Sequence, residues 1–307
     1  MMLQKGDVLF MEYQRMNEQE ALAALYDSGG RAALERISEL RGVDYCLDKQ
    51  LNTDIRIMTA NLLWARWDSQ DKELKKYPIR MKRTAELFNI LKPDFIGLQE
   101  AKQMMREPLG QYLNSKYEYA VFDPPKQNAE WFPILYRADV WRQIASGAGE
   151  YSETRHPWGY VWATFSRTDN ESDMITVMNL HYTLPNYASI DASWGEYRNA
   201  LAEELNATIR KQLTEHPNVP IAITGDYNAG RYTELYEIMV KELPMEDASL
   251  LTENTNYTNE QVRAPSYIDH ITVSRELVDV VCHRCLDYNP YMALSDHSYF
   301  FVDLRGH

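Results

Sequence analysis

Short apolar runs that end in polar residues alternate with amphipathic stretches along most of the chain. The clearest run covers residues 221–224 (IAIT) and stops at residues 225–228 (GDYN). An apolar, β-branched run between breakers is typical of a buried strand, so the polar residues after it are expected at an edge of the sheet. Two interpretations of Asp226 and Asn228 stay open. They belong to a binding site at that edge, or they form a side-chain turn that ends the strand.

The same patterns predict strands and helices that alternate, with several strands following one another directly. Strands are expected over residues 54–62, 94–100, 117–122, 132–136, 160–165, 174–180, 221–224, 266–273 and 298–304. Helices are expected over residues 79–91, 101–113, 193–214 and 232–243, the third from apolar residues spaced by four. Consecutive strands without a helix between them require a mixed sheet, and two layered sheets with helices outside satisfy that requirement.

The first 50 residues differ from the rest of the chain. Residues 17–26 predict one helix, and the apolar residues that follow Gly29-Gly30 predict a second. We therefore expect a helical N-terminal extension over residues 1–50, packed on a main domain over residues 51–307.

Composition limits the classes of function. The 307 residues are 45% hydrophobic, which supports a substantial core. Lys and Arg number 32 against 45 Asp and Glu, a net charge of -13. This balance argues against a protein that grips long nucleic acid by charge alone, but it does not exclude a nuclease with a small basic groove. An excess of acid is also expected where several carboxylates hold a divalent cation.

The cysteines and the start of the chain bear on localisation. Three cysteines, Cys46, Cys282 and Cys285, form no disulfide framework, and an odd count fits a reducing compartment. Residues 278–281, just before Cys282, also indicate a strand. Zinc binding by Cys282 and Cys285 is disfavoured, because residues three apart in a strand face opposite ways. No signal peptide is visible, and no apolar stretch is long enough to cross a bilayer. We expect a cytoplasmic protein without a transmembrane segment.

Six strand edges, far apart in the sequence, end in residues that bind metals or transfer protons. Hard oxygen ligands without a cage of Cys or His suit Mg²⁺ or Mn²⁺, which keep several waters and engage phosphate oxygens. The residues at these edges are Asn61, Glu100, His181, Asp226 with Asn228, Asp269, and Asp296 with His297.

The ordered set of motifs resembles the endonuclease/exonuclease/phosphatase superfamily, which includes deoxyribonuclease I-like enzymes and sphingomyelinase-like phosphodiesterases. The motifs span about residues 54–304 and are residues 59–61 (TAN), 97–100 (GLQE), 179–181 (NLH), 225–228 (GDYN), 268–270 (IDH) and 295–297 (SDH). The resemblance implies an α/β fold, a four-layer sandwich of two mixed β-sheets flanked by helices. It also implies a divalent-metal-dependent hydrolase of phosphoester bonds, either a phosphodiesterase or nuclease, or a phosphatase.

The resemblance also implies roles for the residues at the strand edges. Glu100 would be the principal ligand of Mg²⁺ or Mn²⁺, with Asn61 beside it and Asp296 as a further ligand. His297 would contact the scissile phosphate or act as general base, and Asp269 would orient its ring.

By the same resemblance, the remaining strand-edge residues would act on the attacking water and on the phosphate. Asp226 would position or deprotonate the attacking water. Asn228 and His181 would donate to phosphate oxygens, where charge grows in the transition state. Glu130, which precedes a predicted strand, would pair with His181 and raise its pKa. The alternative is that Glu130 is simply solvated.

Other residues have competing interpretations. Family members often carry an arginine before the strand at residue 160, and here Arg155 or Arg198 would have to replace it. His270 is expected to be structural because alternation points it away from the side of Asp269, and Asp303 and His307 are expected at the surface. Five tryptophans near motif ends either line a cleft or pack in the core, namely Trp64, Trp67, Trp131, Trp158 and Trp194.

Three functions compete. The first is metal-dependent hydrolysis of a small phosphoester, a phospholipid head group or a short nucleic acid strand. The second is a catalytically silent scaffold that uses the same fold for binding. The third is glycoside hydrolysis by two of the carboxylates, which leaves the paired His and Asn positions unexplained.

Overall fold

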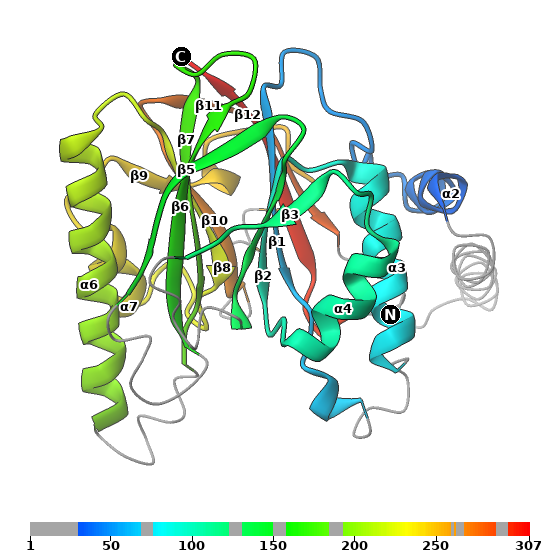
Figure 1. Cartoon of the computed structure of the whole chain (residues 1–307), viewed down its shortest axis with the longest axis horizontal. Helices are drawn as coiled ribbons and strands as arrows, with labels where there is room; N and C mark the ends of the chain where they lie inside the picture. The colour runs from blue at the N-terminus through cyan, green and yellow to red at the C-terminus, as the bar shows by residue number, and fades with distance from the viewer. Residues whose placement is uncertain are drawn as a thin grey trace, which may run out of the picture.

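Two six-stranded sheets pack face to face, with helices on both outer sides (Figure 1). The computed structural model describes residues 30–68, 76–122, 131–149, 158–183, 193–258, 261, 267–286 and 294–307. The order in the first sheet is β11 (Val278–Leu286), β12 (Tyr299–Gly306), β1 (Ile55–Asn61), β2 (Phe95–Gln99), β4 (Ile134–Arg137) and β3 (Tyr117–Tyr119). The order in the second is β5 (Trp141–Ala148), β6 (Gly159–Arg167), β7 (Met174–His181), β8 (Ile221–Asp226), β10 (Asp269–Ser274) and β9 (Met245–Asp247).

The helices form the two outer layers (Figure 1). The first sheet is covered by α2 (Arg31–Arg41), α3 (Tyr77–Leu91) and α4 (Gln103–Tyr112), and the second by α6 (Ser193–Glu215) and α7 (Glu234–Val240). Short 3-10 turns are η1 (Ala65–Trp67) and η4 (Ala248–Leu250). The expected four-layer α/β sandwich with mixed sheets is therefore confirmed.

Strand alternation explains why three hydrophobic clusters form. In β1, Ile55 and Ile57 join the cluster between the two sheets, whereas Met58 and Ala60 join the cluster under α3 and α4. All seven residues of β1 are buried because both faces of the sheet are covered. The same alternation places Cys282 and Cys285 in different clusters, as expected for a strand and not for a zinc site.

Each sheet contains one parallel pair of strands. In the first sheet, α3 connects β1 to β2, which lies parallel beside it. In the second, α6 connects β7 to β8 in the same way. Because the other pairings are antiparallel, these two units are the places where consecutive carboxyl ends of strands lie next to each other.

The part of the N-terminal region that the structure describes packs on the main domain. Ala33, Leu34 and Ile37 of α2 are buried, as are Tyr45 and Leu47 after it. These side chains belong to the same hydrophobic cluster as the outer face of the first sheet. The helix expected near residue 17 lies outside the described residues.

Two strands escaped the sequence patterns. β5 forms an edge of the second sheet, and most of its residues are half-buried or exposed. A bulge between Gln143 and Ala145 also breaks its alternation. β9 has only three residues. Short or irregular edge strands lack the periodic apolar signal on which the expectations depended.

Asp303 was wrongly expected at the surface. It is fully buried in β12 and accepts two bonds from the guanidinium of Arg56, at 2.6 and 2.8 Å. The other donors of Arg56 contact the main-chain oxygens of Leu47, Asp48 and Leu91, so all five of its N–H groups are used. The ion pair therefore joins the N-terminal region, α3 and two strands. His307 is exposed as expected.

Replacing Arg56 by Met tests this junction. The change leaves the Asp303 carboxylate buried without its cation, so we expect the free energy of unfolding to fall by about 3–5 kcal/mol. Urea denaturation followed by circular dichroism measures the change. Arg305→Met, which removes an exposed ion pair with Asp279, is the control and should stay close to wild type. Equal stability of both variants would contradict a structural role for the buried pair.

Candidate active site

The carboxyl ends of the two parallel pairs meet between the sheets. In the first sheet, β1 ends at Asn61 and Glu100 directly follows β2. In the second, His181 ends β7 and lies opposite Asp226, which ends β8. β10 runs antiparallel to β8 and starts with Asp269 opposite Asp226. The topology thus delivers groups from both sheets to one end of the sandwich.

Asn179 joins the two sheets immediately below this point. Its amide nitrogen donates to the main-chain oxygens of Leu98 (2.7 Å) and Phe132 (2.9 Å) in the opposite sheet. Its carbonyl oxygen accepts from Gln99 Nε2 at 2.7 Å and from Thr224 Oγ1 at 3.0 Å. The sequence pattern places this amide in the NLH motif at a strand end but does not predict that it joins the two sheets.

The contact between the sheets explains the glycine in the GLQE motif. A Cβ atom at Gly97 would lie 1.9 Å from Thr224 Oγ1 and 2.4 Å from Asn179 Oδ1. Any larger residue would have to push the sheets apart, so Gly97 permits the approach that brings Glu100 near Asp226.

Asp226 is the centre of the group. Its Oδ2 accepts from Asn61 Nδ2 at 3.0 Å, and it lies 3.6 Å from His181 Nε2 and 3.8 Å from His297 Nε2. Burial and then the negative charge of Asp269 raise the pKa of Asp226 to about 6. At neutral pH this carboxylate is mostly ionised but close to the point at which it can take up a proton.

His297 is held by Asp269. Its Nδ1 donates to Asp269 Oδ2 at 2.7 Å, which points Nε2 toward Asp226. Burial opposes a charge on this ring, but the charges of Asp269 and Asp226 outweigh burial and raise the pKa of His297 well above its usual value. The ring therefore carries a positive charge among carboxylates.

The pKa of His181 is shifted in the opposite direction from that of His297. It is buried, and burial lowers the pKa of its ring, so it is neutral at physiological pH. Its Nδ1 is buried and has no hydrogen-bond partner among the described residues. Glu130, the predicted partner, lies outside the described residues, so that pairing stays a prediction.

Glu100 lies on the other side of Asn61. It has a φ of 58°, and its Oε2 accepts from the main-chain N–H of Trp64 at 2.6 Å. Burial raises the pKa of Glu100, the Trp64 N–H and the charge of His297 oppose this, and the charge of Asp296 adds to it. A half-buried carboxylate, Glu100, thus lies near the exposed carboxylate of Asp296.

The SDH motif is tied to the end of β1. Ser295 Oγ donates to the main-chain oxygen of Asn61 at 2.6 Å and accepts from the main-chain N–H of His297 at 3.1 Å. Asp296 between them is exposed. The motif therefore brings Asp296 and His297 to the same end of the sandwich as Asn61.

Asn228 combines both interpretations of its motif. Its main-chain N–H donates to Asp226 Oδ1 at 2.9 Å in a side-chain turn, while Asp226 Oδ2 faces the site. Its own Nδ2 donates to the Tyr182 carbonyl at 2.6 Å, so one amide hydrogen is already used and one is left for a phosphate oxygen. Arg198 Nη2 donates to the Asn228 carbonyl at 3.3 Å.

The donor set fits a hard divalent cation. Among the described residues, Asp226, Asp269 and His297 form a group whose ligand atoms lie within 4.8 Å of one another. This closeness reflects the bond between Asp269 and His297, so these atoms do not form a free cage. The predicted set of Glu100, Asn61 and Asp296 supplies oxygen ligands next to it, and clustered carboxylates favour a cation between them.

A second buried pair, His270 and Asp247, lies next to the site and holds the main chain near Asn228. His270 is fully buried, and its two ring nitrogens contact Asp247 Oδ2 at 2.7 Å and the Ala229 carbonyl at 3.0 Å. Each ring nitrogen thus lies within hydrogen-bond distance of an acceptor oxygen. The pair fixes the chain just after Asn228. His270 is structural, as expected, but its pairing with Asp247 was not predicted, because Asp247 lies in a short strand without a motif.

Asp247→Asn tests this support. Burial opposes the charge of Asp247, but the hydrogen bond and charge of His270 outweigh burial and lower its pKa. A lowered carboxyl pKa contributes stability above the unfolded value, about 3.9, and this stability is lost as pH falls through the folded value. We expect the variant to lose about 1.5–3 kcal/mol at neutral pH, and the difference to shrink in acid. Urea titrations between pH 7 and pH 3 measure it; a constant difference would contradict the ion pair.

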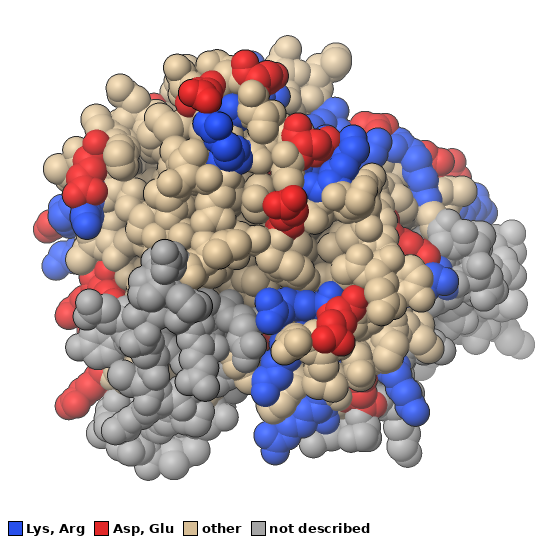
Figure 2. Space-filling model, in the orientation of Figure 1, with Lys and Arg blue, Asp and Glu red and all other residues tan. Residues whose placement is uncertain are grey.

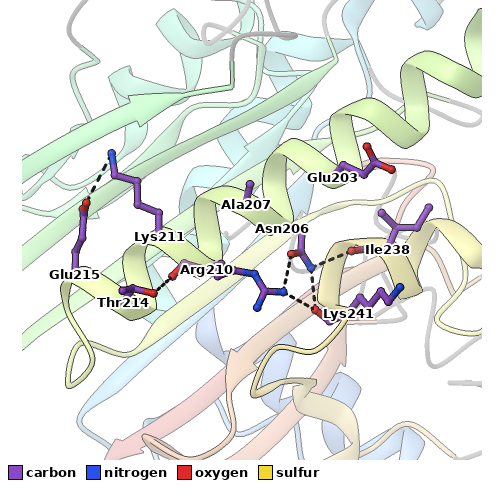
Figure 3. A pocket seen from close by; sticks show the side chains of 9 residues that line it. All are labelled: Glu203, Asn206, Ala207, Arg210, Lys211, Thr214, Glu215, Ile238 and Lys241. Carbon is purple, nitrogen blue, oxygen red and sulfur yellow. Dashed lines mark hydrogen bonds and ion pairs between the residues drawn. The ribbon is translucent and has the colours of Figure 1, made fainter.

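A groove of about 610 Å³ between α6 and α7 is not the active site (Figure 3). Asn206 crosses it and donates to the main-chain oxygens of Ile238, Met239 and Lys241 at the end of α7. Lys211 pairs with Glu215 along α6. None of the predicted site residues lines this groove, and its polar groups serve to join the two helices.

Comparison with known families now identifies the group to which the chain belongs. The sequence profile of the endonuclease/exonuclease/phosphatase family matches residues 58–297, the range that carries all nine predicted site residues. The chain belongs to this family. Members of the family are hydrolases of phosphoester bonds, and they generally use a divalent metal.

Solved structures of other family proteins share the fold. One from Bacteroides vulgatus, an endonuclease/exonuclease/phosphatase, has 20% identity and a TM-score of 0.65, covering 83% of this chain and 100% of that chain. A mannosyl-6-phosphatase from Bacteroides thetaiotaomicron has 20% identity and a TM-score of 0.64, covering 82% and 99%. The catalytic domain of human nocturnin, with bound sulfate, has 16% identity and a TM-score of 0.63, covering 85% and 97%.

Two further comparisons are negative. No curated protein matches the chain. Of the helices that the structure describes, none has both the length and the apolar character needed to cross a membrane.

Proposed function

We propose that this family member is a Mg²⁺- or Mn²⁺-dependent phosphoester hydrolase. The observation that carries the proposal is the meeting of Asp226, the Asp269–His297 pair and Glu100 at the carboxyl ends of two parallel strand pairs. A carboxylate with a pKa of about 6 beside a positively charged imidazole is suited to proton transfer from water at neutral pH.

In the proposed mechanism, Glu100, Asn61 and Asp296 would hold the metal. A bound Mg²⁺ or Mn²⁺ would supply positive charge that offsets the phosphate charge and assists the leaving oxygen. Asp226 orients the attacking water and accepts its proton, and the amide of Asn61 keeps the carboxylate in place.

Three further side chains act on the phosphate. His297 presents its protonated Nε2 to a phosphate oxygen, with Asp269 fixing the ring and its charge. Neutral His181 and the remaining amide hydrogen of Asn228 donate to phosphate oxygens as negative charge grows there.

The competing functions are less consistent with this geometry. A silent scaffold gains nothing from a buried carboxylate whose ionisation burial opposes, as at Asp226. A glycoside hydrolase needs two carboxyl groups free to act on the sugar, whereas Asp269 is engaged by His297 at 2.7 Å. The buried Asp226 and the engaged Asp269 therefore favour phosphoester hydrolysis over both alternatives.

The substrate class that we propose is a small phosphoester, a phospholipid head group or a short nucleic acid strand. The mannosyl-6-phosphatase of similar fold makes a sugar phosphate a reasonable first compound to test. A cytoplasmic location is also proposed, because all three cysteines are free thiols.

Metal removal and two substitutions test the mechanism. We expect hydrolysis of bis-p-nitrophenyl phosphate with Mg²⁺ or Mn²⁺ and loss of activity in EDTA. Asp226→Asn and His297→Ala should each lower kcat/KM about 10²- to 10⁴-fold, the usual contribution of a general acid or base, with little change in melting temperature. Asp279→Asn, at an exposed site, is the matched control. Hydrolysis in EDTA, or a loss of only a few-fold in both variants, would remove the proposed mechanism.

A double-mutant cycle tests the predicted pairing of Glu130 with His181. If the carboxylate acts only through the imidazole, Glu130→Gln combined with His181→Ala should be no slower than His181→Ala alone. Steady-state kcat/KM for all four proteins gives the coupling. Fully additive losses would show that the two residues act separately.

A further inference from the structure

A row of alternating indoles and cations borders Glu100. Lys102 Nζ lies 4.0 Å from the ring centroid of Trp131 and 4.6 Å from that of Trp64. The guanidinium carbon of Arg66 lies 5.4 Å from the Trp64 ring and 5.3 Å from the Trp67 ring. We call this set the indole-cation row, in the order Trp131, Lys102, Trp64, Arg66 and Trp67.

The row is fixed to the candidate metal ligand by main-chain bonds. The Trp64 N–H donates to Glu100 Oε2 at 2.6 Å, and the Lys102 N–H donates to the Glu100 carbonyl at 3.0 Å. The Trp131 carbonyl accepts from Ala101 at 2.9 Å. The Trp64 and Trp131 rings pack edge to face with centroids 5.1 Å apart. The two indole rings and the main chain of Lys102 are therefore tied to Glu100 and its neighbour Ala101.

Indole rings, not carboxylates, are the described neighbours of Lys102 and Arg66. Across the described part of the chain, no acidic side chain pairs with Lys102 or Arg66, although the sequence has 45 acidic residues against 32 basic ones. An indole attracts a cation but leaves its charge and its N–H donors available. Lys102 is half-buried and Arg66 is exposed. Figure 2 shows several Lys and Arg side chains, with acidic side chains among them, in the part of this face where α4 and η1 lie.

We propose that the indole-cation row binds a second phosphate group of the substrate, on the Glu100 side of the scissile phosphorus. This inference rests on the proposed function and narrows it to phosphoesters that carry at least two phosphates. Ammonium and guanidinium groups are the usual protein partners of phosphate. The indole faces already restrict the conformations of the two side chains. Phosphate binding therefore loses less side-chain entropy than it would with freely rotating side chains.

The test compares two substrates that differ by one phosphate. These are thymidine 5′-(p-nitrophenyl phosphate) and the same compound with a 3′-phosphate, both with Mg²⁺. Lys102→Met keeps an apolar stem on the indoles and removes the charge. We expect kcat/KM to fall about tenfold more for the two-phosphate substrate than for the one-phosphate substrate, mainly because KM rises. A tenfold change is the size expected for the loss of one charged hydrogen bond. Lys102→Arg should restore most of the difference.

The control is Lys211→Met, which removes a lysine from α6 in the groove of Figure 3, away from the site. It should leave the ratio of the two kcat/KM values at the wild-type value. If Lys102→Met lowers kcat/KM equally for both substrates, or for neither, the second-phosphate site is overturned.

Two further measurements distinguish failure of the second-phosphate site from failure of the proposed hydrolase function. Calorimetric titration in EDTA with adenosine 3′,5′-bisphosphate and adenosine 5′-monophosphate needs no turnover. Loss of the preference for the bisphosphate in Lys102→Met supports the row even if hydrolysis is absent and the proposed function fails; an unchanged preference overturns it. A 5′-phosphorylated dithymidylate and fructose 1,6-bisphosphate then distinguish a nucleic acid strand from a small metabolite as the source of the second phosphate.

Discussion

The active-site geometry depends on the hydrogen bonds of one buried amide, Asn179. Its nitrogen binds main-chain oxygens of the first sheet, and its oxygen accepts from Gln99 of that sheet and from Thr224 of its own. Close approach of the sheets is possible because Gly97 has no side chain there. A displacement of the two sheets by a few tenths of an ångström at this contact would also move Glu100 and Asp226, since each lies within two residues of a residue in the contact.

The site that this contact assembles is electrostatically unfavourable without compensation. Burial, together with the negative charges of Asp269 and Asp296, opposes ionisation of Asp226 and Glu100. The fold offsets part of this cost with the charged ring of His297 and with N–H groups from Asn61, Trp64 and the Asn228 main chain. Excess negative charge still remains, which is the condition that favours a divalent cation.

Buried ion pairs elsewhere serve position rather than net stability. The Asp247–His270 pair holds the chain after Asn228, and the Arg56–Asp303 pair joins the N-terminal region to the first sheet. Both lie where main-chain carbonyls would otherwise lack donors. The cations of the indole-cation row differ, because aromatic faces hold them and no carboxylate among the described residues neutralises them. The buried charges are thus paired with one another, whereas the cations at the edge of the site are available to a ligand.

Local sequence was sufficient to locate strands and helices wherever an apolar run or a stripe spaced by four was long enough. It was also sufficient to locate the polar residues at the strand ends, because a breaker after an apolar run places them at the edge of a sheet. Features that depend on partners distant in sequence became visible in the folded protein alone. The edge strand β5, the burial of Asp303, the sheet-joining role of Asn179 and the pairing of His270 with Asp247 are of this kind. Local patterns report the propensity of a segment, whereas burial and pairing are set by the elements that pack against it.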